Sequence, residues 1–139
     1  MSLAAEFVVD CSLTMAWCFE DEATPETDAV LKRLRQSSAI VPAIWPLEVA
    51  NVLRSGERRG RLTQTQTEQI IVDLESLSIL VEPVEIGRAL GHILPLAREH
   101  ALTPYDAAYL ELALRLGLPL ATLDKELRQA AQGLGVTLL

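Results

Sequence analysis

The spacing of apolar residues along the chain predicts strands that alternate with helices. Short, unbroken apolar runs have the length and character of buried parallel strands; they lie at residues 7–9, 39–41, 79–84 and 118–123, with a further apolar stretch at 136–139. Pro83 places the third run at a sheet edge, because proline lacks the amide hydrogen that a central strand donates. The pattern predicts an α/β fold with a central, mainly parallel sheet of four strands, or five if residues 136–139 form another.

The segments between these runs carry apolar residues at helical spacing and have clear start signals. Thr24 with Pro25, and Thr103 with Pro104, combine a capping hydroxyl with a proline suited to a first helical turn, and Thr63 has Gln66 as its capping-box partner. We expect helices at residues 13–19, from 25 onward, 45–59, from 63 onward, 86–97, 104–116 and 125–132.

Two of these helices carry more detailed expectations. In the helix that Thr63 opens, Ile70, Ile71 and Leu74 are expected to form the buried face. The long amphipathic helix at residues 86–97 is expected to bend at Pro95, because proline removes a helical hydrogen bond.

Length and composition limit the class of protein. A chain of 139 residues, half of them apolar, can bury one core, so residues 1–139 are expected to form a single domain. No apolar run approaches the ~20 residues that span a bilayer, and the first residues lack a basic-then-apolar leader pattern. Cys11 and Cys18 have neither disulfide-framework nor zinc-ligand spacing. We therefore expect a cytoplasmic protein.

The net charge of −7 argues against a passive nucleic-acid binder, which would be basic to neutralise phosphates. It argues less against an enzyme whose own acidic residues hold a divalent cation, because the ion inverts the local field and attracts phosphate.

Four acidic residues lie where the predicted elements would bring them together. Asp10 follows the first strand, Asp124 follows the run at residues 118–123, Glu48 lies within an apolar helical stretch, and Asp106 lies in the first turn of another helix. In parallel α/β sheets the functional crevice lies beyond the carboxyl ends of the strands. The arrangement predicts one acidic cation site.

Each acid also has a structural interpretation. Asp106 would complete a capping arrangement with Thr103, Asp124 would cap the last helix, and Asp10 would be a turn residue that follows a strand. Glu48 has apolar neighbours, and a buried, unpaired carboxylate costs several kcal/mol, so a cation or an arginine would have to accompany it.

The donor chemistry selects the ion. Carboxylate oxygens suit Mg²⁺ or Mn²⁺, whereas zinc would require histidine or cysteine. His92 and His100 are expected to face solvent on one helix, so no zinc site is predicted. Ser12 and Thr122, close to Asp10 and Asp124, would add hydroxyl contacts to a bound water or phosphate, or would instead cap local turns.

Four sequence blocks together resemble the motifs of PIN-domain ribonucleases, and most closely those of VapC-type toxins. They are VDCS at residues 9–12, PLEVANVL at 46–53, YDAAYLELA at 105–113 and LATLD at 120–124. The resemblance implies a three-layer α/β/α sandwich, Mg²⁺- or Mn²⁺-dependent cleavage of RNA, a homodimer, and inhibition by a cognate antitoxin protein.

The family's acids map onto the same four residues, its accessory hydroxyl onto Ser12, and the polar position before its last acid onto Thr122. Pro46 in the block that contains Glu48, and Pro104 just before the block that contains Asp106, are small departures from the family's motifs. From the chemistry we expect Asp10 and Asp106 to bind the metal directly. Glu48 and Asp124 would act through water, position the nucleophile or hold a second ion.

Basic residues gather at the far end of the helix that carries Glu48. Arg54, Arg58 and Arg59, with Arg61 beyond them, would grip RNA phosphates, and Arg54 and Arg58 share one helix face. An ordinary solvated helix end is the alternative.

Other protein classes fit less well. A haloacid-dehalogenase-type phosphatase would have a second aspartate where Ser12 lies, and a receiver-like signalling domain would have adjacent acids where Cys11 lies. A catalytically inactive PIN-like binding module would be expected to lack one of the acids, and none is missing.

Overall fold

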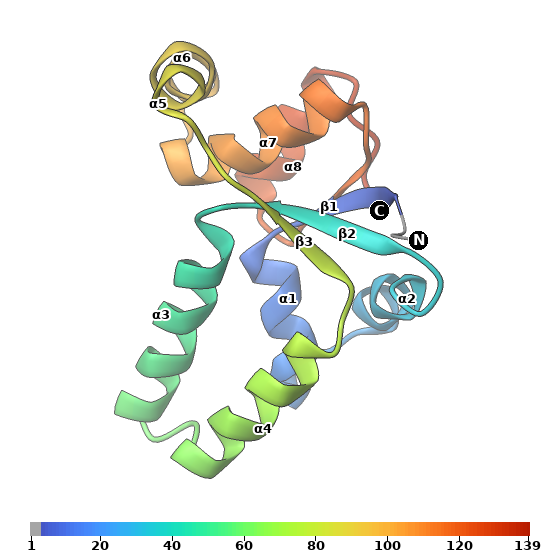
Figure 1. Cartoon of the computed structure of the whole chain (residues 1–139), viewed down its shortest axis with the longest axis vertical. Helices are drawn as coiled ribbons and strands as arrows, with labels where there is room; N and C mark the ends of the chain where they lie inside the picture. Colours follow the sequence, from blue (N-terminus) through green and yellow to red (C-terminus); the bar gives the residue numbers. More distant parts are fainter. Residues whose placement is uncertain (1–3) are drawn as a thin grey trace.

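The protein, described here by a computed structural model of residues 4–139, is built around one four-stranded sheet (Figure 1). Its strands are β1 (Ala5–Val9), β2 (Ser38–Pro42), β3 (Ile79–Glu82) and β4 (Leu120–Ala121). Their order is β3-β2-β1-β4, and every pair is parallel. The predicted α/β class and the edge position of the strand before Pro83 are confirmed. Residues 136–139 do not form a fifth strand, because only Leu138 bridges to Leu120. Residues 1–3 of the predicted domain lie outside the described part.

Helices cover both faces of the sheet and complete the three-layer sandwich. In Figure 1, α1 to α4 lie below the sheet, and α5 to α8 lie above it. They are α1 (Cys11–Cys18), α2 (Pro25–Arg33), α3 (Trp45–Arg58), α4 (Gln64–Glu75), α5 (Ile86–Arg88), α6 (Leu94–His100), α7 (Pro104–Leu116) and α8 (Lys125–Gly133), with a short 3₁₀ turn at Glu20–Glu22. The helix starts at Thr24, Thr63 and Thr103 are confirmed, since each of these side chains caps its helix.

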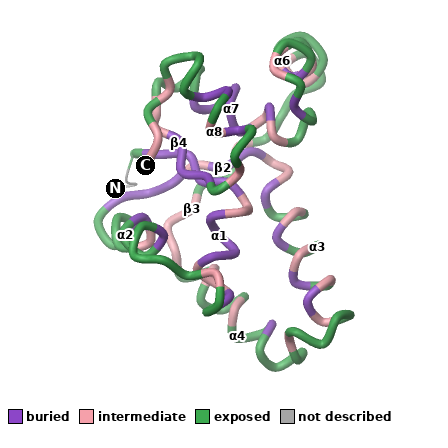
Figure 2. The backbone as a smooth tube through the Cα atoms, turned by 180° about the vertical axis from the view of Figure 1, so that it is seen from behind, coloured by how far each residue is buried: buried purple, intermediate pink, exposed green. Residues whose placement is uncertain are grey.

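The core lies where β1 passes between the two helical layers. Phe7, Val8 and Val9 are all fully buried, because neighbouring strands and helices cover both faces of this central strand. Leu13 of α1 and Leu110 of α7 pack against it from opposite sides. Buried backbone is concentrated in β1, β2, α1 and α7 (Figure 2).

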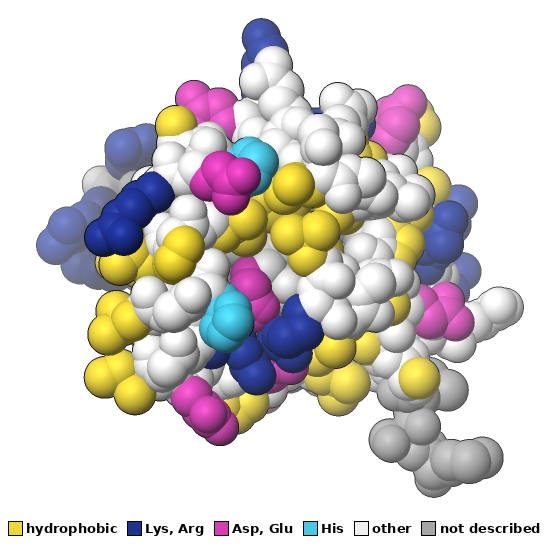
Figure 3. Space-filling view, turned by 90° about the horizontal axis from the view of Figure 1, so that it is seen from above, with side chains coloured by type: hydrophobic (Ala, Val, Ile, Leu, Met, Phe, Trp, Pro, Cys, Tyr) yellow, Lys and Arg dark blue, Asp and Glu magenta, His cyan; other side chains and the backbone are white. Residues whose placement is uncertain are grey.

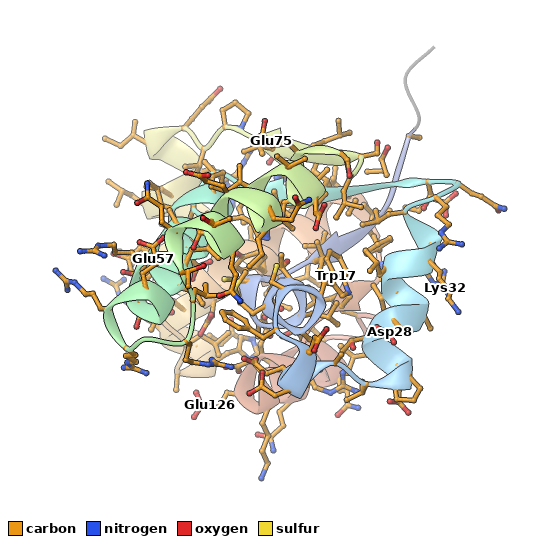
Figure 4. The ribbon with its side chains drawn as sticks, turned by 90° about the horizontal axis from the view of Figure 1, so that it is seen from below. Trp17, Asp28, Lys32, Glu57, Glu75 and Glu126 are labelled. Atoms are coloured by element: carbon orange, nitrogen blue, oxygen red, sulfur yellow. The ribbon has the colours of Figure 1, made fainter. Side chains whose placement is uncertain are left out.

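Helices α3 and α4 form an arm that projects from the sheet as a V (Figure 1). The expected buried face of α4 is confirmed in part: Ile70 and Leu74 are half-buried and pack against the core, whereas Ile71 is 40% exposed. A groove of about 570 Å³ runs between the two helices, and Ile71 and Leu74 line it together with Leu53. Glu57 and Glu75, which also line it, are labelled on this side of the molecule in Figure 4.

The predicted helix at residues 86–97 is found as one unbroken run of helical backbone at residues 86–100, and its irregularity lies just before Pro95. A π-helical turn at Ala89–Ile93 separates α5 from α6. Pro95 directly follows this turn, and the wider π-helical turn accommodates the missing amide hydrogen and the proline ring within a continuous helix.

An ion-pair network ties this helical segment and α7 to the end of β3. Arg88 and Arg115 both contact Glu82, and Arg115 also pairs with Glu111 at 3.0 Å. The two positive and two negative side chains neutralise one another. None of the helices formed by residues 4–139 combines the length and the apolar character needed to cross a membrane.

Candidate active site

The four acids that the sequence singles out all occupy the first turns of helices. Asp10 follows β1 and caps α1, whereas Asp124 follows β4 and caps α8 by accepting the Leu127 amide at 2.8 Å. Glu48 and Asp106 lie in the first turns of α3 and α7. The partial positive charge at a helix N-terminus stabilises carboxylates there. The capping interpretation of Asp124 is thus correct, and Asp10 is also a helix cap.

Asp10 lies at the centre of a dense hydrogen-bond network. Ser12 Oγ donates to both of its carboxylate oxygens at 2.7 and 2.9 Å, the Leu13 amide donates at 3.1 Å, and the Thr122 hydroxyl also donates to it. Asp10 is only 4% exposed. Ser12 and Thr122 therefore contact the acid itself, a use of these hydroxyls that the sequence did not reveal.

Burial and hydrogen bonding act in opposite directions on Asp10. Burial raises the pKa of Asp10 to about 6, although the bonds from Thr122, Leu13 and Ser12 lower it, and the charge of Asp106 raises it further. Asp10 takes part in none of the ion pairs found among residues 4–139, so no positive side chain compensates its charge. Its carboxylate is held in place by hydrogen bonds.

Glu48 is held by a tyrosine that the sequence analysis did not assign. The hydroxyl of Tyr109, a residue only 1% exposed, donates to Glu48 Oε1 at 2.5 Å. Burial raises the pKa of Glu48, the Tyr109 bond lowers it, and the charge of Asp106 raises it. The available signal was spacing, because Tyr109 follows Asp106 by three residues and so shares its helix face.

Asp106 is electrically coupled to the other three acids. Burial raises the pKa of Asp106, and the charges of Asp124 and Glu126 raise it as well. Its own charge in turn raises the pKa values of Asp10 and Glu48. The four acids therefore lie near enough to one another for their charges to interact, and Glu126 is a fifth acid near them that the sequence analysis did not single out.

The donor set fits a hard divalent cation. The convergent groups are carboxylates and hydroxyls, the oxygen ligands that Mg²⁺ and Mn²⁺ prefer. As the side chains of residues 4–139 stand, however, no three His, Cys, Asp or Glu residues are arranged so that they could hold an ion. The acids are thus neighbours coupled by charge rather than a closed cage.

The histidines behave differently from each other. His92 is exposed, as expected, but the expectation is wrong for His100, which is half-buried. Its Nε2 atom is buried and has no hydrogen-bond partner in the described part of the chain. His100 lines a cavity together with Glu126 and Gln129 of α8.

The predicted phosphate-binding arginines lie at the tip of the α3–α4 arm. Arg58 and Arg59 are exposed, and Arg54 pairs with Glu57 at 3.4 Å. The ten residues that separate Arg58 from Glu48 place it about 15 Å away along the helix axis.

Arg61 is engaged elsewhere in the fold. It pairs with Asp21 at 2.9 Å and with Glu22 at 3.4 Å, and its guanidinium stacks 4.2 Å from the centre of the Phe19 ring. It therefore links the end of the arm to the 3₁₀ turn that follows α1.

Comparisons with known proteins agree with the geometry. The family model of the PIN domain matches residues 7–133. Ribonuclease VapC3 from Pyrobaculum aerophilum is 28% identical over 124 residues, which cover 89% of this chain and 93% of the relative. Ribonuclease VapC12 from Mycobacterium tuberculosis is 32% identical over 107 residues, which cover 77% of this chain and 80% of the relative.

A solved structure also matches nearly the whole fold. The crystal structure of PAE2754 from Pyrobaculum aerophilum superposes with a TM-score of 0.72 at 27% identity, covering 94% of this chain and 90% of that one. Family model, relatives and fold agree with one another. The chain belongs to the PIN domain family.

Proposed function

We propose that this chain is a Mg²⁺- or Mn²⁺-dependent endoribonuclease that hydrolyses RNA phosphodiester bonds, and that it is the toxin of a type II toxin–antitoxin pair. Its relatives are named as VapC ribonucleases, which supports nuclease activity. The observation that carries the proposal is the coupling of Asp106 to Asp10, Glu48 and Asp124, because such a concentration of negative charge favours a divalent cation.

In this proposal Asp10 and Asp106 would hold the cation directly, and Glu48 and Asp124 would bind it through water, position the attacking water or hold a second ion. When bound, the cation supplies the positive charge that activates a water and stabilises the charge developing on the phosphoryl oxygens. Ser12 and Thr122 keep the Asp10 carboxylate in one orientation. Tyr109 does the same for Glu48. Hydrolysis would leave 5′-phosphate and 3′-hydroxyl ends.

The test is an RNA cleavage assay with the purified chain in Mg²⁺, Mn²⁺ or EDTA. Asp10→Asn should reduce the cleavage rate by at least about a hundredfold and leave the circular dichroism spectrum unchanged. Asp28→Asn, a change at an exposed residue near the start of α2, should cleave RNA at the parental rate. Cleavage by Asp10→Asn at the parental rate, or cleavage that persists in EDTA, would contradict the proposal. No cleavage by the parent in Mn²⁺, across diverse RNA pools, would favour an inactive PIN-like binding module.

The haloacid-dehalogenase and receiver alternatives have lost their support, because the chain belongs to another family. In the proposed enzyme, Arg54, Arg58 and Arg59 would contribute phosphate contacts away from the reacting centre.

A second copy of the chain is the proposed structural partner. Leu47, Val84 and Leu90 line an open apolar groove of about 420 Å³, and Ile86 beside them is 78% exposed. Figure 3 shows the face that carries α5 to α8, where apolar side chains reach the surface between charged ones. The mutually neutralised ion-pair network lines the same groove, so two copies could meet there without the repulsion expected from a chain of net charge −7.

Sedimentation tests this partner directly. The parent should sediment as a dimer, and the Ile86→Asp/Leu90→Asp variant should sediment as a folded monomer. Val72→Asp, a change at a 61% exposed residue of α4, should remain dimeric. A monomeric parent at micromolar concentration would contradict the dimer.

The second proposed partner, a cognate antitoxin, should form a stable complex with the chain and abolish its RNA cleavage on co-expression.

A further inference from the structure

The hydroxyl of the buried residue Tyr109 is hydrogen-bonded to one of the four acids, Glu48. Tyr109 is placed on α7, one helical turn after Asp106, and its ring is enclosed in the core. Its hydroxyl crosses from α7 to α3 to reach Glu48 Oε1. Among the hydrogen bonds and ion pairs of residues 4–139, this is the one side-chain contact that the Glu48 carboxylate makes.

We propose that Tyr109 is a positioning residue that fixes the Glu48 carboxylate for cation binding. The proposal rests on the metal-dependent function proposed above. A glutamate has three side-chain torsions and would lose their freedom on binding an ion. Tyr109 restricts that freedom beforehand, because its own ring is immobilised by packing. Its bond engages Oε1 and leaves Oε2 without a protein hydrogen bond from the described residues.

The start of α3, from which Glu48 projects, is held from the other side as well. Trp45 Nε1 donates to Thr14 Oγ1 at 3.1 Å, and the same hydroxyl donates to the Asp10 carbonyl at 2.8 Å. The backbone that carries Glu48 is thereby tied to the backbone that carries Asp10. The conformational freedom that remains is the rotation of the Glu48 side chain, and the hydrogen bond from Tyr109 restricts that rotation.

The chain contains a matched control for removal of this hydroxyl. It has two tyrosines, and Tyr105 lies on the same helix with a ring that is 58% exposed. Tyr109→Phe and Tyr105→Phe therefore make the same chemical change at a buried bonded site and at an exposed one. No hydrogen bond of the Tyr105 hydroxyl is found among residues 4–139.

Mn²⁺ binding measured by calorimetry on the full chain, without RNA, provides the primary readout. Tyr109→Phe should weaken Mn²⁺ affinity by roughly 10- to 100-fold, as removal of a bond to a ligating carboxylate does. Tyr105→Phe should bind as the parent does. In the Glu48→Gln background, Tyr109→Phe should cause no further loss. In RNA cleavage, the Mn²⁺ concentration for half-maximal rate should rise, while the rate at saturating Mn²⁺ stays within a few fold of the parent.

The outcomes separate this inference from the proposed function. A parent that neither binds Mn²⁺ nor cleaves RNA overturns both. A parent that does both, with a folded Tyr109→Phe variant of unchanged Mn²⁺ affinity and Mn²⁺ dependence, overturns the inference alone and leaves Tyr109 with a packing function.

A second measurement applies if Tyr109→Phe does not fold. In the Tyr105→Phe chain, Tyr109 is the sole tyrosine, and its Raman doublet reports whether the phenol hydroxyl donates a strong hydrogen bond. The donor pattern should persist when Mn²⁺ is bound and disappear in the additional Glu48→Ala variant. Loss of the donor pattern on Mn²⁺ binding would mean that the ion displaces the bond, and would overturn the inference.

Discussion

The hydroxyl of Thr122 donates a hydrogen bond to the carboxylate of Asp10, a residue 112 positions earlier in the chain. The same oxygen accepts the Asp124 amide at 3.0 Å, and Ser12 Oγ accepts the Leu123 amide at 3.0 Å. These bonds join the turn after β1 to the turn after β4. Two neighbouring strands thereby place Asp10 and Asp124 at the same edge of the sheet, and Thr122 lies at the junction.

Replacing Thr122 by valine tests this junction. The shape is retained, but the buried Asp10 carboxylate loses a donor and the half-buried Asp124 amide loses its acceptor. Unsatisfied buried groups cost about 1–3 kcal/mol, so urea unfolding should show a loss of that size. Thr65→Val on the exposed face of α4 is the control and should change the free energy of unfolding by a few tenths of a kcal/mol. Equal stability of the two variants would mean that the junction contributes nothing.

The raised pKa of Asp10 gives the stability of the metal-free protein a characteristic pH dependence. Its pKa is about 6 in the folded chain and 3.8 as the reference value. Between these values the folded protein holds a proton that the unfolded chain has released. The Asp10 contribution is therefore complete below pH 3.8 and is lost as the pH rises to 6. A shift of about two units corresponds to about 3 kcal/mol.

This prediction is checked by urea unfolding in EDTA at several pH values for the parent and for Asp10→Asn. The difference in unfolding free energy, parent minus variant, should decrease by about 2.4 kcal/mol from pH 4 to pH 7, because pH 4 already lies slightly above the reference pKa. Taking the difference removes the contributions of acids that do not interact with Asp10, and leaves its coupling to Asp106 as part of the measured value. A difference that grows with pH would show that the bonds from Thr122, Ser12 and Leu13 outweigh burial.

The strands and the positions of the acids follow from local signals in the sequence. Short apolar runs predict β1 and β2, and parallel pairing then brings the residues after β1 and β4 to one edge. What the sequence could not indicate depends on partners distant along the chain. The spacing of Tyr109 from Asp106 predicts a shared helix face, but nothing local identifies Glu48, 61 residues away, as its acceptor.

The errors have the same origin. Ile71 has the spacing of a buried helical residue, yet it is exposed because α3 and α4 leave the sheet together and no third layer covers them. Pro95 is correctly a point of irregularity, but the sequence does not indicate its form, which is a π-helical turn at Ala89–Ile93 within a continuous helix. Likewise, nothing local in the sequence indicates that Arg61 pairs with Asp21, 40 residues earlier in the chain.

The exposed arginines at the end of α3 should supply part of the affinity for RNA. Each phosphate contact contributes about one unit to the slope of log affinity against log salt. In the Asp10→Asn background, which prevents cleavage, Arg58→Glu/Arg59→Glu should therefore weaken RNA binding and reduce the magnitude of that slope by about two. Fluorescence anisotropy with labelled single-stranded RNA over a range of salt concentrations measures both quantities.

A control with the same change in net charge distinguishes local contacts from the overall field. Lys32→Glu/Arg35→Glu alters exposed residues in and just after α2, at the opposite end of the sheet from α3 in Figure 1. Both double variants make the chain more negative by the same amount, so general repulsion would weaken RNA binding equally in the two. A larger loss and a smaller salt slope for the Arg58/Arg59 variant alone would locate phosphate contacts at the arm. Equal losses with an unchanged slope would identify Arg58 and Arg59 as ordinary solvated side chains, and RNA would then have to bind closer to the acids.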